Sequence, residues 1–294
     1  MTNDDVLQEL IELLALEKIE ENLFRGQSQD LGFGAVFGGQ VLGQALSAAA
    51  QTAPEGRQIH SLHSYFLRPG DVKHPIVYQV DRIRDGRSFT TRRVVAIQKG
   101  RAIFNLSASF QKEEEGFEHA DPMPAVEPPE AFLSEQDLAL KIIDQIPRSW
   151  RARSLSVKPI EIRPVDPINP LTPEPRESTQ HSVWLRAIGE LSDAPSLHRY
   201  LLAYASDFYF LPTAMRPHGV SPFTPHLQFA SLDHAMWFHR PFRMDDWLLH
   251  VMESPSASGA RGLVRGRFYN QEGALVASTM QEGLMRLWDG APEP

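Results

Sequence analysis

The chain has 294 residues, of which 42% are hydrophobic and 22% charged, a composition typical of one large or two ordinary folded domains and not of a disordered chain. It contains no cysteine, which excludes disulfides, zinc–thiolate sites and a cysteine nucleophile. Its net charge of −8 argues against nucleic acid as the main partner.

The first predicted element is a helix from Gly39 to Ala50, whose small and apolar residues on nearly every face indicate burial. The glycine-rich segment 32–39 before it does not have the G-x-G-x-x-G spacing, and no βαβ unit surrounds it, so we reject NAD and FAD. The simpler interpretation is a turn that lets the chain pass close to the helix start. The alternative is that Gly38 and Gly39 expose backbone amides where negative charge develops on a reacting carbonyl.

Three predicted strands follow the first helix, at Ile76–Ile83, Ser88–Gln98 and Ala102–Gln111. Asp85-Gly86 and Lys99-Gly100 lie between them and are typical hairpin turns. Because antiparallel strands can be joined by such short loops, we expect a meander sheet.

A segment of different composition, Glu113 to about Arg153, separates this sheet from the rest of the chain. Its acidic start and its prolines between Pro122 and Pro129 cannot extend a sheet, so it is predicted to be a linker. Within it, Ser134 to Ile146 is a predicted helix with Ser134 as N-cap. An edge strand is expected at Ile160–Arg163.

The second part of the chain repeats the order of helix and strands. A helix is predicted from about Leu197 to Leu211, where Pro212 would end or kink it. Strands are predicted at Trp247–Glu253, Gly262–Tyr269 and Ala274–Arg286.

An internal repeat links the two parts. The sequence Tyr-Phe-Leu-Arg-Pro at 65–69 matches Trp-Phe-His-Arg-Pro at 237–241, an offset of 172 residues that also places Ala102 on Ala274. One central helix wrapped by an antiparallel sheet, twice over, is α+β architecture. We expect domains at 1–112 and 154–290, joined by the linker at 113–153.

One carboxylate is conspicuous in the second predicted helix. Asp207 lies within the otherwise apolar segment 201–210, and a carboxylate is costly to bury unless it is paired or functional. The alternative, a carboxylate that reaches solvent or caps a neighbour, is left open by the residues alone. Ser231 and Gln281 are ordinary strand residues, but the offset places Ser231 on Ile59 and Gln281 on Ser109, so this polar set is confined to the second copy.

The histidines offer weaker candidates. His234 and His239 differ in parity along one strand, so they point to opposite faces and cannot share a metal ion. No G-x-S-x-G elbow occurs, which argues against a serine hydrolase. We interpret these histidines, and His60 and His63, as packing and hydrogen-bonding groups of the sheet. The arginines are interpreted as solvated strand residues, with phosphate binding as the alternative: Arg84, Arg87, Arg92, Arg93, Arg261, Arg265 and Arg267.

The segment Ser231-Leu-Asp-His-Ala-Met-Trp-Phe-His-Arg-Pro-Phe242 strongly resembles the acyl-CoA thioesterase II family, the tandem double-hotdog thioesterases. So do the segments 63–70, 204–207 and 254–281, and the resemblance covers nearly the whole chain. It implies a double hotdog, that is, two antiparallel sheets each wrapped around a central helix. It also implies hydrolysis of medium- to long-chain fatty acyl-CoA to the free acid and CoA.

The resemblance implies a catalytic set of Asp207, Ser231 and Gln281, which would hold and activate a water molecule. Many bacterial members carry threonine where this chain has Ser231; the hydroxyl is retained, while the lost methyl allows looser positioning. Gly38, Gly39 and His63 are assigned to substrate binding. No metal and no cofactor are expected.

Two other functions remain as alternatives. A hotdog enoyl-CoA hydratase or dehydratase would favour a histidine paired with the helix acid, and the second predicted helix offers none near Asp207. A non-catalytic acyl-CoA-binding module would not need Asp207, Ser231 and Gln281 all to be present. We expect a cytoplasmic protein, because the acidic start shows no signal peptide and no apolar run approaches the roughly 18 residues of a membrane span. The expected partners are acyl-CoA and further copies of the chain in a homodimer or homotetramer, without stable membrane anchoring.

Overall fold

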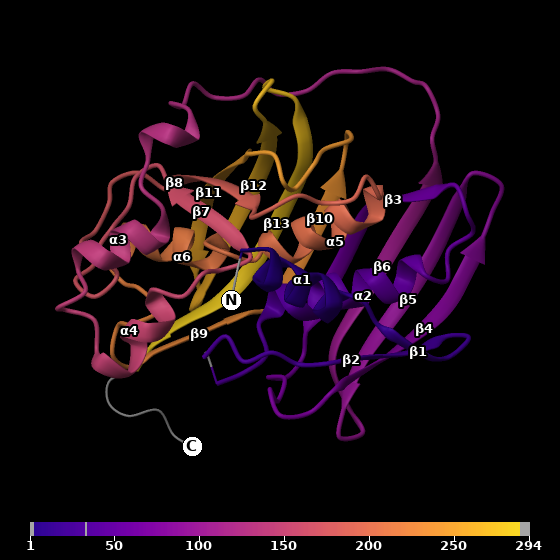
Figure 1. Ribbon diagram of the computed structural model, residues 1–294, viewed down its shortest axis with the longest axis horizontal. Coiled ribbons are helices and arrows are strands. Elements are labelled where there is room, and N and C mark those ends of the chain that lie inside the picture. The colour runs from indigo at the N-terminus through magenta and orange to yellow at the C-terminus, as the bar shows by residue number, and fades with distance from the viewer. Residues whose placement is uncertain (1–2, 33, 289–294) are drawn as a thin grey trace.

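The computed structural model describes residues 3–32 and 34–288, so Phe33 of the glycine segment and the last two residues of the predicted second domain lie outside it. Strands of the first part form one side of a large antiparallel sheet (Figure 1): β1 (Glu17–Glu20), β2 (Leu23–Gly26), β3 (Arg57–Phe66), β4 (Ile76–Asp85), β5 (Phe89–Gln98) and β6 (Arg101–Lys112). Strands of the second part form the other side: β7 (Ile160–Pro164), β8 (Gln180–Ala187), β9 (Leu227–Ser231), β10 (Asp233–Phe238), β11 (Leu248–Ser258), β12 (Arg261–Asn270) and β13 (Leu275–Leu287).

The two expected sheets are joined edge to edge. The strand order is β1-β2-β4-β5-β6-β3-β10-β13-β12-β11-β8-β7, with β9 also paired to β13, which makes one 13-stranded sheet. The junction is the antiparallel pair β3–β10, in which His63 lies opposite Ala235. The double hotdog is therefore confirmed, with its two sheets continuous. The predicted edge strand is confirmed as β7, the last strand in the order.

Four helices lie on one face of the sheet: α1 (Asn3–Leu14), α2 (Gly38–Ala50), α5 (Pro195–Ala205) and α6 (Phe210–Met215) (Figure 1). Every residue of α2 from Gly39 to Ala49 is buried, as its sequence predicted. Helix α2 packs on β2–β6 and on α5. A glycine at 43 permits this close approach, because a Cβ there would lie 3.1 Å from the Tyr200 carbonyl oxygen of α5.

The prediction of one continuous second helix is wrong, because two helices stand in its place. Helix α5 ends at Ala205, and α6 begins at Phe210. The break comes at Tyr209, which has a left-handed φ of 63°, and not at Pro212. Pro212 instead occupies the first turn of α6, where a missing backbone N–H costs no helical hydrogen bond. Asp207 therefore lies in the turn between two helices.

The linker carries more structure than expected. Ser134 caps α3 (Glu135–Lys141) in a capping box with Asp137, which confirms the predicted N-cap, although the helix ends before Ile146. The sequence did not predict α4 (Arg148–Ser154) or the short 3-10 turn η1 (Pro129–Ala131) here, nor α1 and the 3-10 turn η2 (Arg216–His218) elsewhere in the chain. The limits 1–112, 113–153 and 154–290 stay predictions.

Strand pairing corrects the repeat after the last hairpin turn. Ile97 lies opposite Ala102, and Tyr269, 172 residues later, lies opposite Leu275, so Ala102 corresponds to Leu275 and not to Ala274. Val264 lies opposite Gln281 in the second half, and Arg92, 172 residues earlier, lies opposite Ala108 in the first. Gln281 thus corresponds to Ala108 and not to Ser109. The reason is the β12–β13 turn, residues 271–273, which is one residue longer than Lys99-Gly100.

Candidate active site

Asp207 lies where the two halves of the molecule meet. It is partly buried, two residues beyond the end of α5. A Cβ built on Gly38, the first residue of α2, would lie only 2.6 Å from Asp207 Oδ2. The helix N-terminus of the first half therefore faces the carboxylate of the second half, and the first backbone N–H groups of α2 have no partner within their own helix.

Ser231 and Gln281 join Asp207 in a continuous series of hydrogen bonds. The Gln281 amide Nε2 donates to Ser231 Oγ at 2.8 Å. Ser231 Oγ in turn donates to Asp207 Oδ1 at 3.4 Å, a long hydrogen bond of the kind that tightens when substrate binds. Three side chains that are far apart in the sequence thus converge, as the resemblance implied.

Local structure explains how the two strand residues reach each other. Ser231 is the last residue of β9 and pairs with Gly283 of β13. Gln281, two residues earlier on β13, points to the same face as Gly283. Its side chain is 1% exposed, so its amide must find its partners inside the protein.

His234 was missed as a member of this site. Its Nδ1 lies 2.6 Å from Gln281 Oε1, and its Nε2 lies 3.0 Å from the hydroxyl of Ser206. Burial lowers the pKa of His234, and the nearby Asp207 carboxylate offsets part of that shift. The sequence analysis looked for a histidine near Asp207 only on the second helix, whereas His234 comes from β10. The inward-facing alternation of His234, Met236 and Phe238 was the available signal.

Gly38 and Gly39 are at the site, but His63 is not. A Cβ on Gly39 would lie 2.1 Å from the Tyr204 carbonyl oxygen, so both glycines are required by close packing against α5 and its following turn. His63 is exposed and its ring contacts Trp237, with centroids 5.2 Å apart. Its neighbours Leu62 and Ser64 are buried, so His63 points to the opposite face of the sheet.

The first half lacks a matching polar set. Ile59, Leu62 and Ala108 occupy the positions of Ser231, His234 and Gln281. Arg92 was expected at a solvated face, but it is fully buried, where it pairs with Asp85 and hydrogen-bonds Thr52 beyond the end of α2. Most of the other strand arginines pair with acids, for example Arg265 with Glu253 and Arg267 with Asp121. The residues therefore define one candidate site, in the second half.

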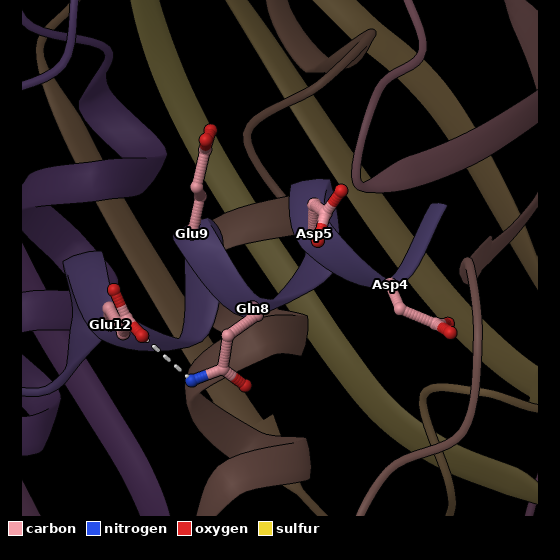
Figure 2. Close-up of a pocket in the computed structure, with 5 residues that line it drawn as sticks. All are labelled: Asp4, Asp5, Gln8, Glu9 and Glu12. Carbon is pink, nitrogen blue, oxygen red and sulfur yellow. Dashed lines mark hydrogen bonds between the residues drawn. The ribbon is translucent and has the colours of Figure 1, made fainter. Parts of the chain in front are cut away.

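The described residues give little support for a metal site, for an anion site on α1 or for a membrane-spanning helix. Among residues 3–32 and 34–288, no group of three or more metal-binding side chains comes together. Figure 2 shows a hollow on α1 lined by Asp4, Asp5, Gln8, Glu9 and Glu12. Its four carboxylates would repel an anionic ligand such as a CoA phosphate. In the same described part of the chain, each helix is too short or too polar to cross a bilayer.

Comparison with known proteins agrees with this architecture. A family model described as acyl-CoA thioesterase matches residues 165–284, and one described as acyl-CoA thioesterase N-terminal domain matches residues 27–111. Acyl-CoA thioesterase 2 of Haemophilus influenzae is 45% identical over 96% of this chain and 98% of its own length. Human acyl-coenzyme A thioesterase 8 is 42% identical over 94% of this chain and 88% of its own length.

Solved structures show the same fold. The acyl-CoA thioesterase II TesB2 of Mycobacterium marinum superposes with a TM-score of 0.77 at 42% identity, covering 97% of this chain and all of the other. A hot dog protein of Alicyclobacillus acidocaldarius superposes with a TM-score of 0.74 at 21% identity, covering 95% of this chain and 98% of the other. The fold and these relatives define a double-hotdog thioester hydrolase. The chain belongs to the acyl-CoA thioesterase family.

Proposed function

We propose that the protein hydrolyses medium- to long-chain fatty acyl-CoA to the free acid and CoA, with a water molecule activated by Asp207, Ser231 and Gln281. The observation that carries the proposal is the hydrogen-bonded series from Gln281 through Ser231 to Asp207. A thioester has a good leaving group, so an oriented and partly deprotonated water suffices and no covalent nucleophile is needed.

The chemistry follows from the residue types. As the water oxygen bonds to the thioester carbonyl carbon, the Asp207 carboxylate accepts the water proton. The Ser231 hydroxyl and the Gln281 amide hold the water, and the backbone amides at Gly38 and Gly39 face the developing oxyanion. The carbon–sulfur bond then breaks, and the departing CoA thiolate takes up the proton.

Aromatic side chains beside Asp207 favour an apolar acyl group. Phe37 stacks on Phe208, with ring centroids 4.5 Å apart, and contacts Tyr204 edge-on at 5.3 Å. Phe66 lies 3.1 Å from the position of a Cβ on Gly38. A hydrolysis profile across acyl-CoAs of increasing length tests the chain preference. A rate that falls steadily as the chain lengthens would contradict it.

The first test of the catalytic set is Asp207→Asn, which keeps the shape and removes the basic carboxylate. We expect kcat to fall by about 10²- to 10⁴-fold, the usual contribution of a general base, without loss of folding. Asp233→Asn is the matched control. Asp233 is a partly buried carboxylate beside His234 in the sequence, and it accepts a hydrogen bond from the Glu282 backbone N–H without taking part in the Gln281–Ser231–Asp207 series. Near wild-type turnover of D207N would contradict the assignment.

Hydration of an enoyl-CoA is the second candidate, because His234 lies close to Asp207. Its fully buried ring is held between Gln281 and Ser206, which favours hydrolysis. Release of free thiol from an acyl-CoA, compared with loss of enoyl absorbance, separates the two reactions. A non-catalytic acyl-CoA-binding module would release no thiol. The cytoplasmic location and the homodimer or homotetramer remain predictions, and light scattering of the purified chain tests the oligomer.

A further inference from the structure

We propose that His234 is a positioning residue that selects the orientation of the Gln281 amide and thereby directs the Ser231 hydroxyl toward Asp207. This inference rests on the proposed function, since it assigns a role to a fourth residue behind the same three. The His234 ring is 0% exposed and its two nitrogens already contact Gln281 and Ser206, so we place it behind the three residues, acting through them and not on the substrate.

The hydrogen bonds define the protonation of the ring. Gln281 Oε1 is a carbonyl oxygen and can only accept, so the 2.6 Å contact requires a proton on His234 Nδ1. Burial keeps the ring neutral by lowering its pKa, which leaves Nε2 without a proton. The Ser206 hydroxyl lies between two acceptors, the Ala203 carbonyl oxygen at 2.9 Å and His234 Nε2 at 3.0 Å, and with Nε2 unprotonated its single proton can turn to that nitrogen.

The orientation of the amide decides what Ser231 can do. With Oε1 held by His234, the amide presents Nε2 to Ser231, which accepts that bond and keeps its own proton for Asp207. If the amide turned over, its oxygen would face Ser231. The Ser231 proton would then go to Gln281, and the Asp207 carboxylate would lose its partner. His234 prevents this turnover, because its Nδ1–H cannot pair with an NH₂ group.

The repeat supports a role specific to the site. Leu62 occupies the position of His234 in the first half, where Ala108 stands in place of Gln281. A leucine therefore fills the same place in the same fold where there is no amide to orient. Packing alone does not require a histidine there.

The test compares His234→Leu with His250→Leu. His250 is equally buried in the same half, and neither of its ring nitrogens has a hydrogen-bond partner among the described residues. Both variants lose the same volume and polarity, but only H234L loses the bond to Gln281. For H234L we expect kcat to fall about tenfold or more, with KM changed less than twofold, because His234 does not touch substrate. H250L should keep kcat within twofold of wild type.

Two further measurements separate positioning from a packing defect. His234→Asn places an amide N–H near the former Nδ1 and should recover several-fold in kcat over H234L. In a Gln281→Ala background, H234L should cost no further activity, because the amide that it orients is gone. An equal loss in H234L and H250L, or an undiminished effect of H234L in the Q281A background, overturns the proposal.

Asp207→Asn, assayed alongside, distinguishes failure of this inference from failure of the proposed site. If D207N is inactive while H234L retains wild-type kcat, only the role of His234 is lost. If D207N is itself fully active, the catalytic set is wrong and the inference falls with it.

Discussion

At the scale of single residues, the site depends on what is small as much as on what is charged. Position 38 has no room for a side chain, because a Cβ there would lie only 2.6 Å from Asp207 Oδ2. Its backbone φ is not in the left-handed region, so contact and not conformational freedom explains the glycine.

Gly38→Ala should therefore displace the Asp207 carboxylate without unfolding the protein. A misplacement of about 1 Å in a catalytic group can cost about a hundredfold in rate. We therefore expect the kcat of G38A to fall about tenfold to a hundredfold. Steady-state kinetics of G38A beside Gly116→Ala check this, since a Cβ at Gly116 would meet nothing within 4 Å. An unchanged kcat in G38A would contradict the prediction that the added methyl group displaces the Asp207 carboxylate.

At the scale of elements, several boundaries depend on local chemistry that the sequence displays. Ser134 accepts a hydrogen bond from the Asp137 backbone N–H at 3.1 Å, while Asp137 Oδ2 accepts from the Ser134 backbone N–H at 3.2 Å. This reciprocal cap satisfies backbone donors at the start of α3. The turn at Tyr209 has no such signature, because a left-handed tyrosine is not favoured locally. It is held by tertiary contacts, including the hydrogen bond from Tyr209 OH to Glu135.

Ser134→Ala should destabilise the linker helix. Loss of an N-cap side chain costs about 1 kcal/mol, and we expect the free energy of unfolding to fall by about that amount. Urea denaturation of the two proteins measures it. An unchanged free energy of unfolding in S134A would contradict a stabilising role for this cap.

At the scale of the whole molecule, the two halves contribute different residues to the candidate site. The first half contributes the α2 N-terminus and an apolar core, whereas the second contributes the polar series and an unusual number of buried histidines. His181, His198, His234 and His250 are all buried, and burial lowers the pKa of each, that of His181 to about 3. These rings must remain neutral in the folded protein.

This burial predicts acid sensitivity. A histidine with a lowered folded pKa contributes its full stability above the unfolded value of about 6.5, and that stability is lost as the pH falls below it, because the unfolded state takes up the proton first. Between pH 6.5 and 5.5 we expect His181, whose folded pKa of about 3 lies below this range, to contribute a loss of about 1 kcal/mol, with further loss from the other buried histidines. Urea unfolding at a series of pH values measures the slope. His181→Gln should remove the His181 contribution from this slope, and a flat profile would contradict neutral burial.

The sequence by itself determined the repeat, the buried helix α2, the six main hairpin strands and the resemblance that pointed to Asp207, Ser231 and Gln281. These follow from local patterns, since alternation, turn residues and N-caps act over a few positions. It did not predict the helix α1 or the strands β1, β2, β8 and β9, which are short or irregular in pattern. It also did not predict the break between α5 and α6.

Only the tertiary structure decided which side chains meet. Pairing of β3 with β10 joins the sheets, and the contact of α2 with α5 brings Gly38 to Asp207. One extra residue in the β12–β13 turn sets Gln281 opposite Val264, and so determines that its counterpart is Ala108. His234 enters the site, and His63 is turned away, because neighbouring residues of a strand face opposite sides of the sheet. These outcomes depend on register and on contacts between distant segments, which no local pattern specifies.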